Sequence, residues 1–67
     1  MRDWMRNARK HANLTMSEIA QRCGISESYY SMIESGERQK KLDITLAVKL
    51  AEAFDISLET IVLEEAK

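Results

Sequence analysis

The chain of 67 residues has no proline, two glycines, one cysteine and one histidine, and no apolar run long enough to cross a membrane. One cysteine excludes an internal disulfide, and one histidine leaves no ligand set for structural zinc. A core this small must therefore be stabilised by well-capped, closely packed helices or by a partner chain. The lack of a signal peptide and the unpaired cysteine favour the cytoplasm, and we expect no metal or other cofactor.

The chain also lacks the excess of positive charge that the phosphate backbone of nucleic acids rewards, since its net charge is −1. The charge is, however, unevenly distributed. Residues 1–41 carry eight Lys or Arg against five acids, giving +3, whereas residues 42–67 carry two against six, giving −4. This split suits a domain that turns one side toward a polyanion, although +3 is modest enough to arise by chance.

No set of side chains suited to catalysis is found in the sequence. The chain has six serines but only one histidine, His11, that could activate any of them. No pair of carboxylates has a buried setting that would raise the pKa of one member. We therefore expect no enzymatic activity. His11 is interpreted as a solvated residue, and the cations of the first helix are interpreted as a solvated face: Arg2, Arg6 and Lys10.

Helix boundaries must be marked mainly by caps, because proline is missing and glycine is rare. Thr15, with Glu18 three residues later, forms a capping box. Further N-caps, left-handed stops or turns are predicted at six positions: Gly24, Ser26, Gly36, Asp43, Asp55 and Ser57. These signals predict one all-α domain over residues 1–67, with helices at about 3–12, 16–23, 27–35, 44–54 and 58–64.

Apolar residues at helical spacing predict the core. The first helix turns inward Trp4 or Met5, with Ala8 and Ala12, and the fourth turns inward a longer set: Ile44, Ala47, Leu50, Ala51 and Phe54. Hydrophobic staples are predicted for three pairs: Leu14 with Ile19, Ile25 with Tyr30, and Ile56 with Ile61. Cys23 is interpreted as a small buried hydrophobe, and Tyr30 rather than Tyr29 belongs to the core.

The two short helices at 16–23 and 27–35 are the most informative feature of the sequence. Neither is long enough to be stable alone, so the pair must lock together at a steep angle across Gly24. Ala20 supplies the small residue needed where the helices touch. Apolar side chains fall where they would fill the crevice between them: Ile19, Cys23, Ile25, Tyr30 and Ile33. The pattern predicts a helix-turn-helix.

Several motifs extend this pattern along the chain: Leu14-Thr15, Glu18-Ile19-Ala20, Gly24-Ile25-Ser26, Tyr30-Ser31-x-Ile33-Glu34-x-Gly36-x-Arg38 and, more loosely, Leu50-Ala51-x-Ala53-Phe54 and Ile56-Ser57-Leu58. Through them the chain resembles the lambda-repressor-like, Cro-type (XRE) helix-turn-helix family over nearly its whole length. The resemblance implies a compact five-helix fold and a bacterial or phage-encoded cytoplasmic protein. It also implies binding to double-stranded operator DNA as a sequence-specific regulator of transcription.

The resemblance implies roles for individual positions. Glu27, Ser28 and Met32 would face base edges in the major groove, and Tyr29 would lie near the sugar-phosphate wall or a thymine methyl group. Phosphate contacts are assigned to Arg38 and the backbone near Gly36, together with Met16, Ser17, Ser31, Lys40 and Lys41. Arg9 and Glu34 would pair inside the fold. Their role would be to orient the first helix on the third more than to stabilise the fold, because desolvation can cancel the attraction between the two charges.

The chain departs from the family pattern at three places. Many relatives have Gln where Met16 stands, and methionine cannot bind phosphate, although the backbone amides of a helix N-terminus still can. The proline common after the third helix is missing, and Lys40 and Lys41 lengthen the loop and offer a replacement phosphate contact. Asp55 replaces a frequent glycine, which is a small loss because Asp tolerates the left-handed conformation.

The helix at 27–35 lacks Arg, Asn and Gln, the side chains that commonly read guanine and adenine. Glu27 can accept a hydrogen bond from a cytosine amino group, and Tyr29 or Met32 can pack on thymine methyl groups. Glu27 equally suits the positive end of its own helix. A methionine at helical spacing is more often a core residue, but Tyr30 and Ile33 already fill the inner face, which favours an exposed Met32.

We expect a homodimer on a palindromic operator. Two units on half-sites about one helical turn apart roughly square the ratio of specific to non-specific affinity that one unit achieves. Contact candidates are on the last helix: Leu58, Ile61, Val62 and Leu63. Val62 and Leu63 would otherwise cover the open end of the core. The chain is predicted to be a repressor of phage, mobile-element or autoregulated-operon type, without a visible effector site. The alternative is a protein-interaction or antitoxin-like module with weak or no DNA binding, which the acidic pI favours.

Overall fold

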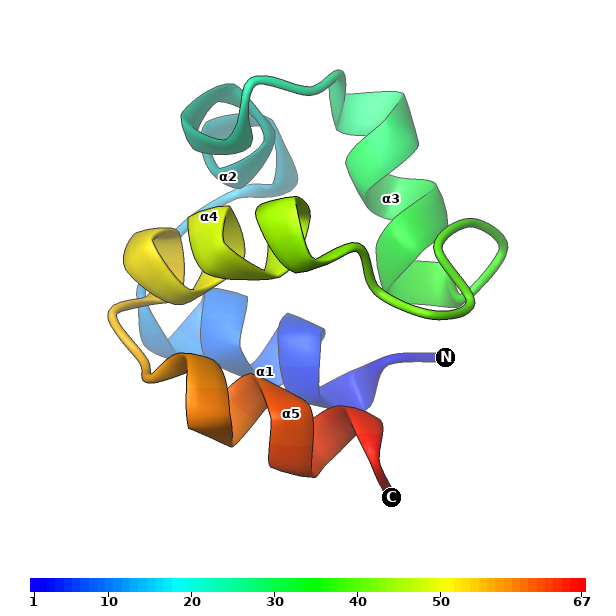
Figure 1. Ribbon diagram of the computed structural model, residues 1–67. Coiled ribbons are helices and arrows are strands. Elements are labelled where there is room, and N and C mark those ends of the chain that lie inside the picture. The colour runs from blue at the N-terminus through cyan, green and yellow to red at the C-terminus, as the bar shows by residue number, and fades with distance from the viewer.

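The computed structural model describes all 67 residues and contains five helices and no strand (Figure 1). In chain order they are α1 (Asp3–His11), α2 (Met16–Cys23), α3 (Glu27–Ser35), α4 (Ile44–Phe54) and α5 (Leu58–Glu65). The predicted bounds differ by one residue at two places only, since α1 ends at His11 and α5 continues to Glu65. None of the five helices has the length and apolarity that a membrane span requires.

Local hydrogen bonds account for the helix starts. The Thr15 hydroxyl accepts from the Glu18 amide at 3.1 Å, and the Glu18 carboxylate accepts from the Thr15 amide at 2.9 Å, which is the predicted capping box. Three other helices are capped by the side chains predicted for them: Ser26, Asp43 and Ser57. The exception is α1, because the residue before it, Arg2, makes no capping bond with its side chain.

Three helices end in the left-handed conformation. Gly24 has φ 71°, Gly36 has φ 89°, and Asp55 ends α4 with φ 58°. Asp is among the few residues with a side chain that adopt this conformation at modest cost, which explains why α4 can end at Asp55 without a glycine. Sharp helix ends allow the short connections that keep the five helices close.

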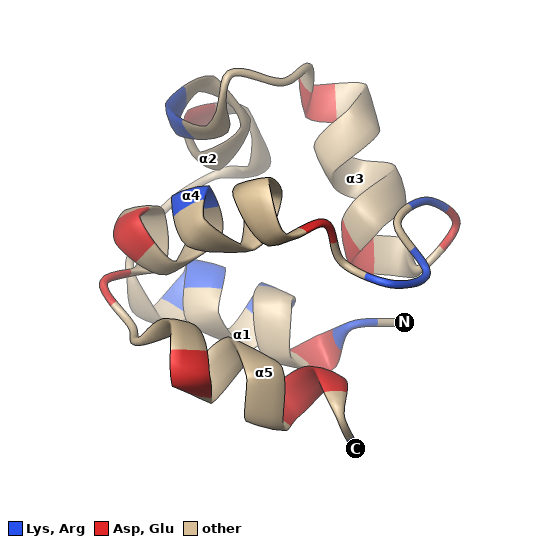
Figure 2. Ribbon diagram, in the orientation of Figure 1, with Lys and Arg blue, Asp and Glu red and all other residues tan.

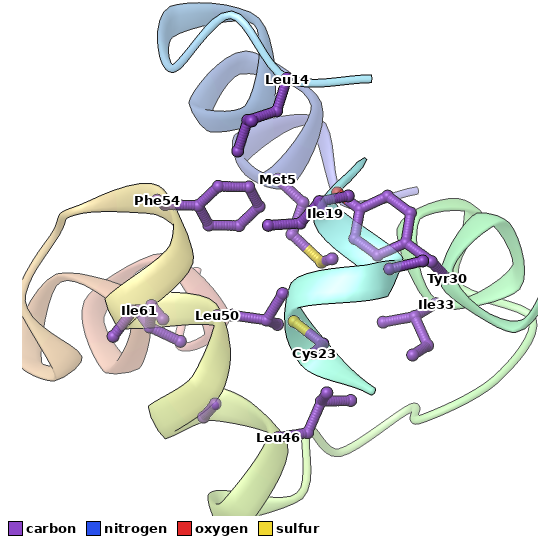
Figure 3. Packing of buried hydrophobic residues seen from close by; sticks show 13 residues of the cluster. Met5, Leu14, Ile19, Cys23, Tyr30, Ile33, Leu46, Leu50, Phe54 and Ile61 are labelled. Atoms are coloured by element: carbon purple, nitrogen blue, oxygen red, sulfur yellow. The ribbon is translucent and has the colours of Figure 1, made fainter. Parts of the chain in front are cut away.

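The core is a cluster of thirteen buried apolar residues drawn from every helix. In Figure 3, Met5, Ile19 and Leu50 lie at its centre, with Phe54 and Ile61 on one side and Tyr30 and Ile33 on the other. Cys23 is 1 % exposed and packs among them as a small hydrophobe, as the sequence predicted. In α1 Met5 is fully buried, and the half-buried Trp4 packs edge-on against Phe54 with ring centroids 6.4 Å apart.

The predicted inward face of α4 is wrong at its first position. Ile44 is 61 % exposed, whereas Leu46, which the periodicity argument omitted, is 7 % exposed and belongs to the core. At about 100° per residue, Ile44 lies roughly a quarter turn away from the centre of the face formed by Ala47, Leu50 and Phe54. Because Asp43 caps the helix directly before it, Ile44 stands in the first turn, where no other helix covers it.

Helix α4 crosses the middle of the molecule and packs against α2 on one side and α5 on the other, while α1 contacts α3 (Figure 1). As a result α3 forms one edge of the molecule. Its inner residues Tyr30, Ile33 and Glu34 are buried, and its outer face has no helix against it. The fold thus presents one complete helix face to solvent.

The Arg9–Glu34 pair expected from the resemblance is present between α1 and α3. Arg9 Nε lies 3.2 Å from Glu34 Oε2 and Nη2 lies 3.3 Å from Oε1, and the two side chains are only 13 % and 3 % exposed. The hydrogen bond to Glu34 raises the pKa of Arg9, so the guanidinium stays charged. Burial likewise raises the pKa of the neighbouring Tyr30, which stays neutral. The pair therefore fixes the orientation of α3 relative to α1.

The interpretation of Arg2 as a solvated residue is wrong. Lys10 and His11 are exposed and Arg6 is partly exposed, but Arg2 is 8 % exposed and lies between the end of α3 and the end of α5. It precedes α1 rather than belonging to it, so the helical face drawn through Arg2, Arg6 and Lys10 does not include it.

Candidate nucleic-acid interface

The outer face of α3 carries the side chains predicted to read DNA. Glu27, Ser28 and Ser31 are exposed, and Met32 is half-buried at the edge of this face. The Ser26 hydroxyl accepts from the Tyr29 amide at 3.0 Å and so fixes where the helix starts. With the helix starting at Glu27, Tyr30 and Ile33 face the core, and the residues on the opposite side of α3 therefore point outward.

A shallow open depression of about 570 Å³ joins this face to the beginning of α2. Its lining combines Met16 of α2 with five residues of α3 and one of the following loop: Glu27, Ser28, Ser31, Met32, Ser35 and Glu37. Five residues assigned to DNA contact from the sequence are thereby brought together, namely Met16, Glu27, Ser28, Ser31 and Met32. Ser17 is exposed on α2 but does not line the depression.

Tyr29 is held by a residue that the sequence analysis did not single out. The Gln39 amide donates to the Tyr29 hydroxyl at 2.7 Å, and the Gln39 carbonyl oxygen of the side chain accepts from the Asp43 amide at 3.0 Å. Gln39 also has φ 55°, so it forms a tight bend. Tyr29 is half-buried, and this hydrogen bond holds its hydroxyl group against the loop. No periodicity or motif marks Gln39, because its partner lies ten residues away across a loop.

The loop after α3 carries the exposed cations of the site. Arg38, Lys40 and Lys41 are all exposed, and they gather beside the C-terminal end of α3 (Figure 2). The loop leaves the helix through Gly36, and the amides of Glu37 and Arg38 both donate to the Met32 carbonyl, at 2.9 and 3.1 Å. The three basic side chains predicted to bind phosphate therefore share one loop segment at the end of α3.

The charges of the site are segregated. No Lys or Arg lines the depression, whereas two acids do, Glu27 at the start of α3 and Glu37 beyond its end. Glu27 lies in the first turn, where a negative charge is stabilised by the helix dipole. The two carboxylates in the depression repel phosphate, so the positive charge that would attract a polyanion lies in the loop at one end of the depression. The same carboxylates can accept hydrogen bonds from donors such as the amino groups of bases.

The dimer-contact candidates on α5 separate into two groups. Ile61 is 1 % exposed and Leu58 is half-buried, so Ile61 serves the core of its own chain and is not available to a partner. Val62 and Leu63 are 56 % and 62 % exposed. Val62 also borders an apolar groove of about 350 Å³ between α4 and α5, at which Ile44 is exposed as well.

Comparison with known proteins gives two findings. A family model described as Helix-turn-helix matches residues 5–61. The chain is also 31 % identical, over 55 residues, to an uncharacterized HTH-type transcriptional regulator, YqaF, of Bacillus subtilis (strain 168), and the match spans 82 % of this chain and 72 % of that protein. No solved structure matches the chain.

Proposed function

Because the chain belongs to the XRE-type helix-turn-helix family of DNA-binding regulators of transcription, we propose that it binds a specific palindromic operator as a homodimer and represses transcription. The regulated operon would be of phage, mobile-element or autoregulated type. The observation that carries the proposal is the depression that joins the start of α2 to the outer face of α3, with the cationic loop at its end.

The proposed docking places α3 in the major groove. The groove is about 12 Å wide and accepts a helix of about 10–12 Å diameter, provided that one side of the helix is free. The outer face of α3 meets that condition (Figure 1). Glu27 would accept from a cytosine amino group, and Met32 would pack on a thymine methyl group. Because α3 has no side chain that binds guanine or adenine through two hydrogen bonds, one unit would distinguish its half-site from other sequences only modestly.

Phosphate contacts would come from both sides of the depression. Arg38, Lys40 and Lys41 supply the charge at the loop. At the start of α2 the capping box occupies the Glu18 and Thr15 amides, whereas the helix geometry leaves the Met16 and Ser17 amides without an intrahelical acceptor. Those two amides can bind a phosphate oxygen although Met16 has replaced the usual glutamine.

The homodimer would form through α5. Val62 and Leu63 expose apolar surface that the core of one chain does not use, and the groove beside Val62 extends it toward Ile44 on α4. An exposed apolar patch on so small a chain favours a protein contact. Two-fold pairing would place two α3 helices on successive half-sites about 34 Å apart.

A second candidate is supported by the carboxylates of the site. Glu27 and Glu37 line the depression without a cation among them, which would suit a basic or hydrogen-bonding protein surface. In that case the chain is an interaction or antitoxin-like module. Salt separates the two candidates, because DNA affinity falls steeply with salt and an apolar protein contact does not.

The test is a fluorescence-anisotropy titration with duplex from the promoter of the chain's own operon and with random duplex, at several salt concentrations. We expect tighter binding to the promoter, and we expect Arg38→Ala to reduce the slope of log affinity against log salt by about 0.9 per chain. Arg22→Ala is the matched control, because Arg22 lies at the end of α2 beside Lys49 and Glu52. Equal binding to both duplexes, or equal losses in the two variants, would contradict the proposal.

A further inference from the structure

Arg2 makes more hydrogen bonds than any other side chain in the structure, and the function proposed above assigns it no role. Its Nε donates to both carboxylate oxygens of Glu65, at 3.1 and 3.0 Å. Its Nη1 donates to the Ile33 carbonyl at 2.7 Å and to the Arg38 carbonyl at 3.4 Å. Its Nη2 donates to the carbonyls of Gln39 and, at 3.4 Å, Lys40. All three guanidinium nitrogens are therefore in use.

The carbonyls that Arg2 binds belong to the cationic loop and to the helix turn before it. Ile33 lies in the last turn of α3, and Arg38, Gln39 and Lys40 are consecutive residues of the loop. Because the carbonyls of the loop point inward to one buried guanidinium, side chains of the same residues can point outward, and those of Arg38 and Lys40 are exposed. The bend at Gln39, with φ 55°, is disfavoured for a residue with a side chain and needs such support.

Glu65 orients the guanidinium from the other end of the chain. Its carboxylate is 23 % exposed, and besides the two bonds from Arg2 it accepts one from Trp4 Nε1 at 2.7 Å. The N-terminal segment is also seated beside the loop, since a Cβ placed on Gly36 would lie 3.5 Å from the Met1 nitrogen. The start of α1 and the end of α5 therefore meet the loop on the same side of the molecule (Figure 1).

We propose that Arg2 is a positioning residue that holds the loop of Arg38, Lys40 and Lys41 in the conformation that meets phosphate, with Glu65 as its orienting counter-ion. Arg2 itself does not touch DNA, because its side chain is 9 % exposed and its donors are occupied. A lysine could not replace it, since a single ammonium cannot bridge four carbonyls and a carboxylate with the planar fork of a guanidinium. The inference rests on the proposed DNA binding.

The first test is Arg2→Lys, which keeps the charge and removes the fork. If the loop loses its phosphate contacts, log affinity against log salt becomes shallower by roughly 1 to 3 per chain. Hydrogen exchange at the amides of Glu37, Arg38 and Asp43, whose acceptors lie in or beside the loop, speeds up while amides of α2 and α4 keep their protection. Arg6→Lys is the matched control on α1, where Arg6 makes only an exposed pair with Asp3.

The second test uses the sign of an electrostatic effect. Glu65→Gln and Glu64→Gln each remove one negative charge from the last turn of α5, and Coulomb repulsion alone predicts that both tighten DNA binding. Glu64 pairs only with Lys67 at the surface, so its variant binds slightly tighter than the native chain. Glu65→Gln frees the guanidinium, and its variant binds more weakly with a shallower salt dependence. This pair keeps the inference testable if Arg2→Lys does not fold.

The outcomes separate the two proposals. If the native chain binds no DNA, the proposed function fails and the role of Arg2 toward phosphate fails with it. If the native chain binds DNA while Arg2→Lys and Glu65→Gln keep its salt dependence and lose only thermal stability, the inference alone is overturned, and Arg2 is an ordinary structural arginine.

Discussion

Replacing Arg9 by methionine removes the partner of a carboxylate that is almost out of contact with solvent. The Glu34 side chain is 3 % exposed, and its two oxygens accept from Arg9 at 3.2 and 3.3 Å. Removing one member of a buried pair costs about 3–5 kcal/mol, because the other charge is left buried and alone. At about 0.05–0.15 kcal/mol per residue the whole chain is stable by roughly 3–10 kcal/mol. Arg9→Met therefore removes from about a third to all of its free energy of unfolding.

The double variant Arg9→Met/Glu34→Leu distinguishes charge from packing. An apolar pair of similar size avoids the desolvation of two charges, so most of the lost stability, about 3 kcal/mol, should return. Urea unfolding followed by the emission of the only tryptophan measures it. Trp4 reports on the fold because its ring packs against Phe54 and its Nε1 donates to Glu65. The midpoint is expected to move while the slope m stays constant.

Two results would refute this reasoning. A loss below about 1 kcal/mol for Arg9→Met would mean that the pair behaves like one at the surface. If the double variant is as unstable as the single one, the loss of stability arises from altered packing and not from the unpaired buried charge. The control is Arg6→Met, because Arg6 and Asp3 are 3.7 Å apart with side chains 43 % and 69 % exposed. It should change stability by less than about 0.5 kcal/mol.

Three further outcomes are expected. Val62→Glu should make the protein monomeric in sedimentation without altering the unfolding of the single chain, because Val62 is 56 % exposed; a persistent dimer would exclude this face of α5. Hydrogen bonds from Thr15 hold the pKa of Glu18 below its ordinary value of 4.5, so its stabilisation is present above that value and lost as pH falls through the lower, folded pKa. Glu18→Gln should thus flatten the acid limb of the melting temperature, and identical limbs in both proteins would argue against the capping box. Burial raises the pKa of the Cys23 thiol, so its reaction with an aromatic disulfide reagent should be slow in buffer and should accelerate with urea along the unfolding curve; immediate reaction of the native protein would contradict its burial.

The helix boundaries and the helix-turn-helix could be predicted from the sequence because the interactions that set them are local. Thr15 and Glu18 are three residues apart, and Asp43 and Ser57 each cap an amide three residues ahead. Because each bond joins groups three residues apart, its two partners can be recognised in the sequence alone. The outward direction of Glu27, Ser28 and Ser31 follows from the same local phase, since the apolar residues of α3 must face α2.

Packing between the helices determines which residues at the margins of those patterns are buried and which groups far apart in the sequence come into contact. Ile44 and Leu46 both lie near the edge of the inner face of α4, so the choice between them depends on where the neighbouring helices end. Arg2 reaches Glu65 across 63 positions of sequence, and Gln39 reaches Tyr29 through a bend that no propensity favours. A hydrogen bond between groups far apart leaves no periodic trace in the sequence, because its partners are selected by how the helices pack.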